Sequence, residues 1–313
     1  MTITQLKYVL AVAEHQNFTL AADKCFVTQP TLSMQIQKIE EELSIQIFDR
    51  TKKPIQLTDI GQKIVNQAKN IVNEADRIQD IVEQQKGFVG GEFRLGIIPT
   101  IMPTLLPMFL NNFIKKYPKV KLIIEELNTD EIITKLNNGH LDAAIAATPL
   151  QEEKIKEIVL YFEPFVAYIP ESHQHYQKQE IEVADLNLDE ILLLQDGHCF
   201  RDGILNLCKN NSRNEINHFQ IESGSFETLI KLADEGLGTT LLPYLHTLDL
   251  KESDKKKLRH FKEPKPAREV SLIFPKSELK IHIIDALRST IAGVVKGAIV
   301  FQNVEIISPI QKK

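Results

Sequence analysis

The apolar residues of the first 43 positions recur at the three- and four-residue spacing of helices that bury one face. The spacing predicts a helix before residue 15, a short helix over 19–24 and, after a turn, a third helix. The third helix opens at Gln29 and Pro30, with Thr28 or Gln29 as its cap and the proline in its first turn. Its expected buried stripe is Leu32, Ile36, Ile39 and Leu43. Two short helices joined by a tight turn are typical of a helix-turn-helix.

The opposite side of the third helix is polar, and it is followed by a basic wing. Glutamine can pair with adenine edges, whereas serine and threonine suit base edges or phosphates. Residues 48–58 predict a two-stranded wing with a basic tip placed for phosphate or minor-groove contact. Residues 1–60 carry six basic and seven acidic residues, so the segment as a whole is not basic. The candidate contacts to double-stranded DNA are Gln29, Pro30, Thr31, Ser33, Gln35, Arg50, Lys52 and Lys53.

Residues 59–90 carry a heptad pattern. Apolar residues are spaced four and three apart, and the positions between them are polar or charged. This pattern predicts a long linker helix that pairs two chains and so presents two recognition helices to DNA. An amphipathic helix packed on its own domain is the alternative. The seam consists of Ile64, Ala68, Ile71, Ala75, Ile78 and Val82, and Gly87, Gly90 and Gly91 form a hinge after it.

From residue 91 to the end, strand-like and helix-like segments alternate, which predicts parallel α/β sheets. Two lobes are expected, the second beginning near residue 161, with the chain returning to the first lobe at 268–274. The strands are expected at 93–98, 120–126, 141–147, 165–169, 191–195, 217–221 and 239–242. The helices are expected at 100–116, 130–138, 199–208, 225–235 and 276–292. The predicted domains are therefore a winged helix-turn-helix (1–58), a dimerisation helix with its hinge (59–90) and a two-lobed regulatory domain (91–313).

Composition narrows the class of protein. The chain has 313 residues, 43% of them hydrophobic, and a net charge of −5, which is typical of a soluble multidomain protein. Three cysteines are too few for a disulfide scaffold and suit a reducing cytoplasm. No signal peptide or membrane-spanning run is evident, so a cytoplasmic location without membrane contact is expected.

Two of the three cysteines lie nine positions apart in residues 197–208. His198 and Arg201 flank Cys199, and two cations would favour its reactive thiolate. On one helix the Cα atoms of Cys199 and Cys208 would be roughly 13 Å apart, whereas a disulfide needs about 5.5–6 Å. A bridge would therefore require this segment to unwind or bend, and Gly197 and Gly203 mark places where it could. Two buried cysteines that never meet remain the alternative.

Several polar residues follow predicted strands, at the edge where open α/β sheets bind ligands. Thr100, Thr129 and the pair His198-Cys199 are of this kind. Both threonines also suit helix caps, which is the alternative for them. From the residues alone, His218 and Arg268 could equally lie on the surface.

Several motifs resemble the LysR-type transcriptional regulator family. They are Ala21-Ala22, the run from Val27 to Ser33, Phe48-Asp49-Arg50 and the run from Leu57 to Gly61. The resemblance implies a periplasmic-binding-protein-like effector domain and DNA readers at Gln29, Pro30, Thr31, Ser33 and Arg50. The chain departs from the family at Met34, where arginine is common, so one phosphate contact would be lost.

The cysteine segment is similar to that of the peroxide-sensing members of this family. The similarity extends over Glu227-Thr228-Leu229 and the run from Gly238 to Pro243. It implies a peroxidatic Cys199 and a resolving Cys208 that form a reversible disulfide. It also implies peroxide placement by Thr100, Thr129, His198, His218 and Arg268. Gly203 and Asn206 differ from the residues expected between the cysteines and would change how readily the helix unwinds.

The same resemblance implies the partners and the output. Hydrogen peroxide is the signal, and glutaredoxin or thioredoxin is the reductant. RNA polymerase is the contact on DNA, the genes are those of oxidative stress, the assembly is a homodimer or homotetramer, and no metal or cofactor takes part. No enzymatic activity is expected. The alternatives are a LysR-type regulator that binds a small organic anion, a thiol peroxidase, and a solute-binding protein.

Overall fold

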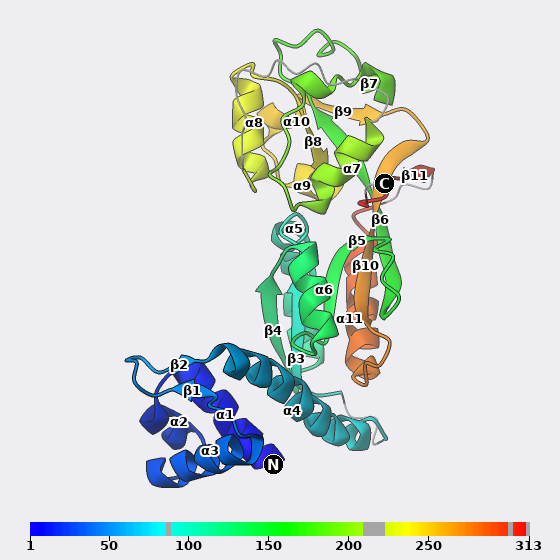
Figure 1. The fold of residues 1–313 in the computed structure, drawn as a ribbon. Coiled ribbons are helices and arrows are strands. Elements are labelled where there is room, and N and C mark those ends of the chain that lie inside the picture. The colour runs from blue at the N-terminus through cyan, green and yellow to red at the C-terminus, as the bar shows by residue number, and fades with distance from the viewer. Residues whose placement is uncertain (86–88, 209–222, 300–302, 311–313) are drawn as a thin grey trace. The chain divides into compact units, whose positions relative to one another are not determined.

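The computed structural model describes residues 1–85, 89–208, 223–299 and 303–310 (Figure 1). They fall into two compact units, Met1–Gly87 and Phe88–Lys313. No helix within the described ranges is both long enough and apolar enough to cross a membrane.

The first unit contains a helix-turn-helix. Its helices are α1 (Ile3–His15), α2 (Phe18–Lys24) and α3 (Gln29–Leu43). Each begins at a capping residue, since side-chain oxygens of Thr2, Asn17 and Thr28 accept backbone N–H groups of the first turn. The α3 helix begins at Gln29 with Pro30 in its first turn, where the sequence predicts it.

The core of this unit confirms three of the four predicted stripe residues of α3. Leu32, Ile36 and Ile39 are fully buried. Leu43 is 37% exposed, so its predicted burial is wrong. It ends the helix, and Ser44 turns the chain away in a left-handed conformation. The predicted wing is formed by β1 (Phe48–Asp49) and β2 (Gln56–Leu57), which pair antiparallel.

The long helix α4 (Asp59–Gln85) packs partly on its own unit. Val65, Ala68 and Val72 are buried in the core that also holds α1 and α3. Ala68, a residue of the predicted intermolecular seam, is therefore an intramolecular contact in this helix. Ile78, farther along, is 65% exposed. The first half of α4 thus follows the alternative interpretation, and the second half leaves an apolar residue open for a partner.

The first lobe of the second unit is a mixed sheet in the order β4-β3-β5-β10-β6. The three strands β3, β4 and β5 are parallel, as predicted, but β10 runs antiparallel to both β5 and β6. The expectation of purely parallel sheets is therefore wrong. The strands are β3 (Gly91–Ile97), β4 (Val120–Glu126), β5 (Ala143–Thr148), β6 (Ile155–Tyr168) and β10 (Lys265–Pro275). The helices are α5 (Met102–Lys116), α6 (Thr129–Asn137) and α11 (Ile281–Val295).

The second lobe is built on the far half of β6, which pairs with β8 and β9, and β9 in turn pairs with β7. The strands are β7 (Glu180–Ile181), β8 (Thr240–Pro243) and β9 (Leu258–Phe261). The helices are α7 (Cys199–Leu207), α8 (Phe226–Asp234), α9 (Tyr244–Leu248) and α10 (Glu252–Lys255), with 3₁₀ turns at Val183–Asp185 and Leu188–Glu190.

Two strands predicted for this lobe, at 191–195 and 217–221, are not among the strands that the structure describes. Residues 191–195 form only a single bridge, between Ile191 and Thr239, so the predicted strand there is wrong. The predicted strand at 217–221 lies outside the described residues. A short strand near the end of the chain, β11 (Val304–Ile306), pairs parallel with β10.

The strands β6 and β10 belong to both lobes, and Figure 1 shows them running from one to the other. Each lobe has its own apolar core. Cys199 packs into the first of these cores, and the next residue, Phe200, packs into the second. The start of α7 therefore lies where the two lobes meet.

Candidate functional site

Cys199 is the first residue of α7, with His198 at the N-cap position. It is 8% exposed. Phe200 packs edge-on against Phe165 and Phe226, with ring centroids 5.1 Å apart in both pairs. These aromatic contacts fix the first turn of the helix, because the phenyl ring is locked into the second-lobe core. The thiol is thereby held against the first lobe.

A buried arginine lies across from this turn. Arg268 of β10 is 3% exposed and binds Glu163 of β6 through two hydrogen bonds, of 2.9 and 2.7 Å. Its remaining donors reach the Thr100 hydroxyl at 2.8 Å and the Thr100 carbonyl at 3.1 Å. Its guanidinium carbon lies 5.1 Å from the ring centroid of Phe200. The second oxygen of Glu163 accepts the N–H of Leu245 at 2.9 Å. The guanidinium thus makes four hydrogen bonds, and both oxygens of the Glu163 carboxylate accept one or more, as burial of two charges requires.

The environment of the Cys199 thiol has opposing effects. Burial raises its pKa, and this effect outweighs the nearby Arg268 charge, the Thr129 hydroxyl and the Ala147 N–H, all of which lower it. The negative charge of Asp202 raises the pKa further. Cys199 is therefore mostly a thiol at rest, with groups beside it that stabilise negative charge once it forms.

The Thr129 hydroxyl is the group of this site that is left open. Its oxygen is buried and has no nitrogen or oxygen partner among the described residues, although it lies close enough to the sulfur to lower the pKa of Cys199. A buried polar atom without such a partner costs free energy, and a small polar ligand would relieve that cost.

His198 and Arg201 differ from the expectation that they stabilise the thiolate. Burial lowers the pKa of His198, so the imidazole is neutral at neutral pH. The guanidinium of Arg201 pairs with Asp196 at 2.9 Å and donates to the Leu194 carbonyl at 3.1 Å. The cation that acts on the sulfur is Arg268, which is far from Cys199 in the sequence.

Cys208 lies at the other end of α7. It is the C-cap residue, 1% exposed in the second-lobe core, and burial raises its pKa to about 11. All three cysteines of the chain are free thiols. At about 1.5 Å per residue the continuous helix separates Cys199 from Cys208 by roughly 13 Å. The two sulfurs can meet only if α7 unwinds.

The exposed start of α3 is the candidate DNA surface. Gln29, Pro30 and Thr31 are exposed, whereas Ser33 is half-buried. The carbonyl oxygen of the Gln35 side chain accepts a hydrogen bond from Gln5 at 3.1 Å, so α1 restrains that side chain. Met34, the residue that departs from the family, is 60% exposed.

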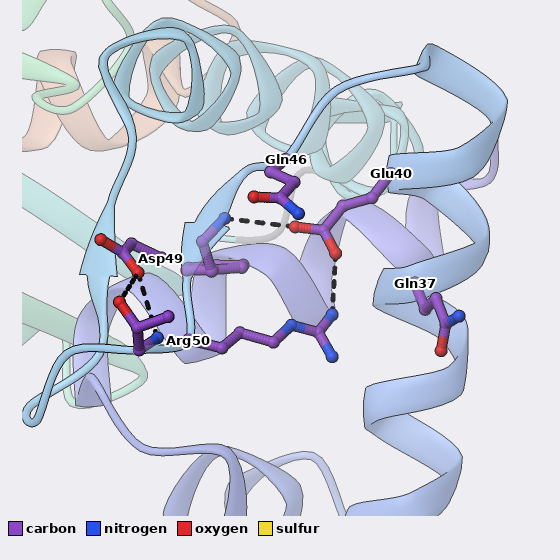
Figure 2. Close-up of a pocket in the computed structure, with 7 residues that line it drawn as sticks. Gln37, Glu40, Gln46, Asp49 and Arg50 are labelled. Atoms are coloured by element: carbon purple, nitrogen blue, oxygen red, sulfur yellow. Dashed lines mark hydrogen bonds and ion pairs between the residues drawn. The ribbon is translucent and has the colours of Figure 1, made fainter.

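The wing is tied to α3 by one carboxylate. Glu40 accepts the backbone N–H groups of Ile47 and Phe48 at 2.8 and 3.2 Å. It also binds Arg50 at 2.7 Å, a contact that Figure 2 shows. Arg50 also lies over the Phe18 ring, 5.2 Å from its centroid. These contacts border a cleft of about 340 Å³, lined by Gln37, Glu40, Gln46, Phe48, Asp49, Arg50 and Thr51. Arg50 is therefore held in place at the edge of an open cleft.

The wing tip carries the other two predicted cations. Lys52 is exposed and donates to the Gln56 side chain at 3.0 Å, and Lys53 is exposed beside it. Both remain available to a polyanion. In the turn between α2 and α3, Phe26 is 95% exposed with a φ of 55°. Sequence reasoning assigned Phe26 no role, although a bulky apolar residue in a turn was the available signal.

Two family models match the chain. Residues 3–62 match the bacterial regulatory helix-turn-helix protein of the lysR family, and residues 86–295 match the LysR substrate binding domain. The chain belongs to the LysR family. A curated relative from this family, the "DNA-binding transcriptional dual regulator OxyR" of Escherichia coli, is 33% identical over 297 residues, which are 94% of this chain and 97% of the relative.

Solved structures of LysR-family proteins agree with this assignment. A full-length OxyR variant from Pseudomonas aeruginosa superposes with a TM-score of 0.74 and 34% identity, covering 93% of this chain and 98% of that one. A peroxide-bound OxyR cysteine mutant from Corynebacterium glutamicum superposes with a TM-score of 0.63 and 28% identity, covering 95% and 93%. The winged helix-turn-helix and the two-lobed α/β effector domain are thus confirmed, and the chain is a DNA-binding transcription regulator.

The structure brings together most of the predicted effector-domain residues. Thr100, Thr129, Cys199 and Arg268 meet where the two lobes join, from four separate segments of the chain. His218 lies outside the described residues. Sequence reasoning missed Glu163, although a single carboxylate in the apolar run from Tyr161 to Tyr168 was a usable signal. Within the described ranges, no group of three or more His, Cys, Asp and Glu side chains is arranged to hold a metal ion.

Proposed function

We propose that this LysR-family regulator senses hydrogen peroxide through Cys199 and Cys208 and controls oxidative-stress genes by binding their promoters. The observation that carries the proposal is the setting of Cys199: a buried thiol beside the Arg268 cation and the open Thr129 hydroxyl. The names of the matched relatives support it, since several are called hydrogen peroxide-inducible genes activators.

The first chemical step occurs at Cys199. The thiol loses its proton, and the thiolate attacks one oxygen of hydrogen peroxide, breaking the O–O bond. The sulfur becomes a sulfenic acid, and the leaving hydroxide takes up the proton and departs as water. Arg268 and Thr129 stabilise the negative charge as it forms, which matters here because burial disfavours the resting thiolate. The hydroxyl and the carbonyl of Thr100 each accept a hydrogen bond from the Arg268 guanidinium, and these bonds position it.

The second step joins the two cysteines. The Cys208 thiol condenses with the sulfenic acid, so a disulfide forms and a second water leaves. Two thiols and one peroxide thus give one disulfide and two waters. Because the bridge requires α7 to unwind, oxidation remodels the junction of the lobes. Glutaredoxin or thioredoxin returns the thiols by exchange.

The remodelled effector domain then acts on DNA through the assembled chains. The second half of α4, where Ile78 is exposed, pairs two chains into a homodimer, and effector-domain contacts build a homotetramer. The recognition helices and the wing cations Arg50, Lys52 and Lys53 bind two half-sites. A change in their spacing alters the contact with RNA polymerase.

The test is a footprint on the DNA upstream of the protein's own gene, with reduced and peroxide-treated full-length chain. Wild type is expected to change its footprint on oxidation, and Cys199→Ser is expected to keep the reduced pattern. Mass spectrometry of the treated wild type is expected to show a bridge between Cys199 and Cys208. A Cys199→Ser variant that still responds to peroxide would refute the mechanism. A response to an organic anion that ignores both cysteines would indicate a metabolite-controlled regulator instead.

A further inference from the structure

The last described residues of the chain are bound to the helix that joins the two cysteines. Asn206 lies on α7, two residues before Cys208. Its side-chain amide donates one hydrogen bond to the Ser308 carbonyl at 2.8 Å and another to the Ile310 carbonyl at 3.0 Å. Both amide hydrogens of Asn206 are therefore used on a segment about a hundred residues away.

The segment that accepts these bonds, 304–310, is itself anchored. Its strand β11 pairs with β10, and the Ile307 N–H donates to the Ala267 carbonyl at 2.8 Å. Ile307 packs against the second-lobe core, the same core that holds Cys208. Pro309 is buried. Segment 304–310 is thus fixed to β10, the strand that carries Arg268, and is not a loose end.

We propose that Asn206 is a positioning residue that clamps α7 to segment 304–310 and thereby sets how readily the Cys199–Cys208 disulfide forms. This inference rests on the proposed function. Asn206 lies inside the stretch that must unwind before the sulfurs can meet. When that stretch unwinds, both hydrogen bonds to the segment must break first.

The clamp is built so that it can release. The Asn206 side-chain oxygen is buried and has no hydrogen-bond partner among the described residues. Such an oxygen carries a desolvation cost, which is recovered when the side chain reaches water. The two hydrogen bonds from the Asn206 amide therefore stabilise the helical, reduced form of α7, while the desolvation cost of the unpaired oxygen limits this stabilisation.

The substitution Asn206→Ala would have two opposite effects on the rate at which α7 unwinds, one through the helix propensity of residue 206 and one through loss of the clamp. Alanine is a better helix former than asparagine, so Asn206→Ala would strengthen an isolated α7 and slow its unwinding. If the clamp holds the helix, the same substitution removes two hydrogen bonds and unwinding becomes faster. The two explanations are separated by the direction of the change.

The experiment uses the full-length chain treated with peroxide, quenched by alkylation at intervals and analysed by mass spectrometry for the bridge. Asn206→Ala is expected to form the bridge about tenfold faster than wild type, the effect of losing two hydrogen bonds of ordinary net strength. Asn206→Asp, which keeps the size but loses the donors, is expected to act in the same direction. The matched control is Asn303→Ala, which removes an exposed hydrogen bond to Glu263 directly before the same segment and should leave the rate unchanged.

A second measurement does not depend on oxidation. Hydrogen exchange of the α7 backbone amides in the reduced chain is expected to be about tenfold faster in Asn206→Ala and unchanged in Asn303→Ala. If wild type forms the bridge but Asn206→Ala alters neither measurement, the clamp is refuted and the proposed function stands. If exchange accelerates but wild type forms no bridge, the clamp stands and the proposed disulfide chemistry is refuted.

Discussion

Removing one partner of the buried pair Arg268–Glu163 tests both the fold and the chemistry of the site. The pair is 3% and 1% exposed, and Arg268 makes four hydrogen bonds to Glu163 and Thr100. In Arg268→Met the Glu163 carboxylate would keep, among the described residues, only the hydrogen bond from the Leu245 N–H, and its buried charge would be uncompensated. We expect both Arg268→Met and Glu163→Gln to be strongly destabilising.

The magnitude follows from the burial of the two charges. Breaking a buried ion pair by removing one partner costs about 3–5 kcal/mol. For a unit of this size, 1 kcal/mol corresponds to about 2–4 °C in Tm, so a fall of about 6–20 °C is expected. Replacing both partners by apolar residues should recover most of the loss, because no charge is then left uncompensated.

The two single variants should differ in their effect on Cys199. Arg268 lowers the pKa of this thiol. Arg268→Met should therefore move the pH midpoint of Cys199 alkylation upward. Glu163→Gln keeps the cation and removes its counter-ion, so it should move the midpoint downward.

The assay is scanning calorimetry for the unfolding of residues 88–313, together with the pH dependence of Cys199 alkylation. The matched control is Lys121→Met, which breaks the exposed contact with Glu92 and should leave both measurements unchanged. The expected role of the pair is refuted if Arg268→Met has the same Tm as Lys121→Met, or if both single variants move the midpoint of Cys199 alkylation in the same direction.

Four further predictions follow from contacts outside that pair. Arg50→Ala should weaken promoter binding and lower the slope of log K against log salt by about one, measured by fluorescence anisotropy; an unchanged slope would mean that Arg50 contacts no phosphate. Ile78→Asp should shift the chain toward monomer in sedimentation, and an intact dimer would place the contact elsewhere. Burial raises the pKa of Cys208 to about 11, so the contribution of this thiol to stability is complete below its ordinary pKa near 9 and is lost as pH rises to 11. Cys208→Ser should therefore reduce the fall in the free energy of unfolding between pH 9 and pH 11, measured by urea unfolding. An equally steep fall in the variant would contradict this prediction. Phe26→Asn should raise the free energy of unfolding by about 1 kcal/mol, because asparagine tolerates the left-handed conformation better, and a loss of stability would show that the ring is needed in the fold.

The helix-turn-helix could be predicted because its determinants are local. The cap Thr28, the proline at position 30 and the buried stripe of α3 all lie within one helix length of each other. The one wrong position, Leu43, is the last residue of the helix, and the chain turns directly after it at Ser44 in a left-handed conformation. Periodicity alone does not show where a buried face ends.

The effector domain was harder to predict from the sequence because the two strands that connect its lobes lie far apart in the chain. The 14-residue strand β6 crosses two cores, and its partner β10 is about a hundred residues later. The alternation of helices and strands suggested parallel sheets throughout, but β10 runs antiparallel to β5 and β6, and β6 runs antiparallel to β8 and β9. No spacing within either segment encodes that direction.

The candidate site shows the same division. Thr100 and Thr129 could be placed because residues that follow parallel strands converge at one edge. The strand expected before Cys199 is only a single bridge, between Ile191 and Thr239. The partnership of Arg268 with Glu163 depends on the register of β6 and β10, which brings the two residues opposite each other. What the sequence does contain is a lone carboxylate, Glu163, in an apolar run, and burial of that charge requires a partner.

The packing of α4 against α1 has a practical consequence for dividing the protein. Val65, Ala68 and Val72 close the hydrophobic core of the DNA-reading unit, although they lie beyond the wing. A fragment that ended at residue 58 would lack these three residues, and the rest of that core would be exposed to water. A truncated protein meant to bind DNA without the effector domain, or a fusion of this unit to a new sensor domain, should therefore retain the helix at least through Val72.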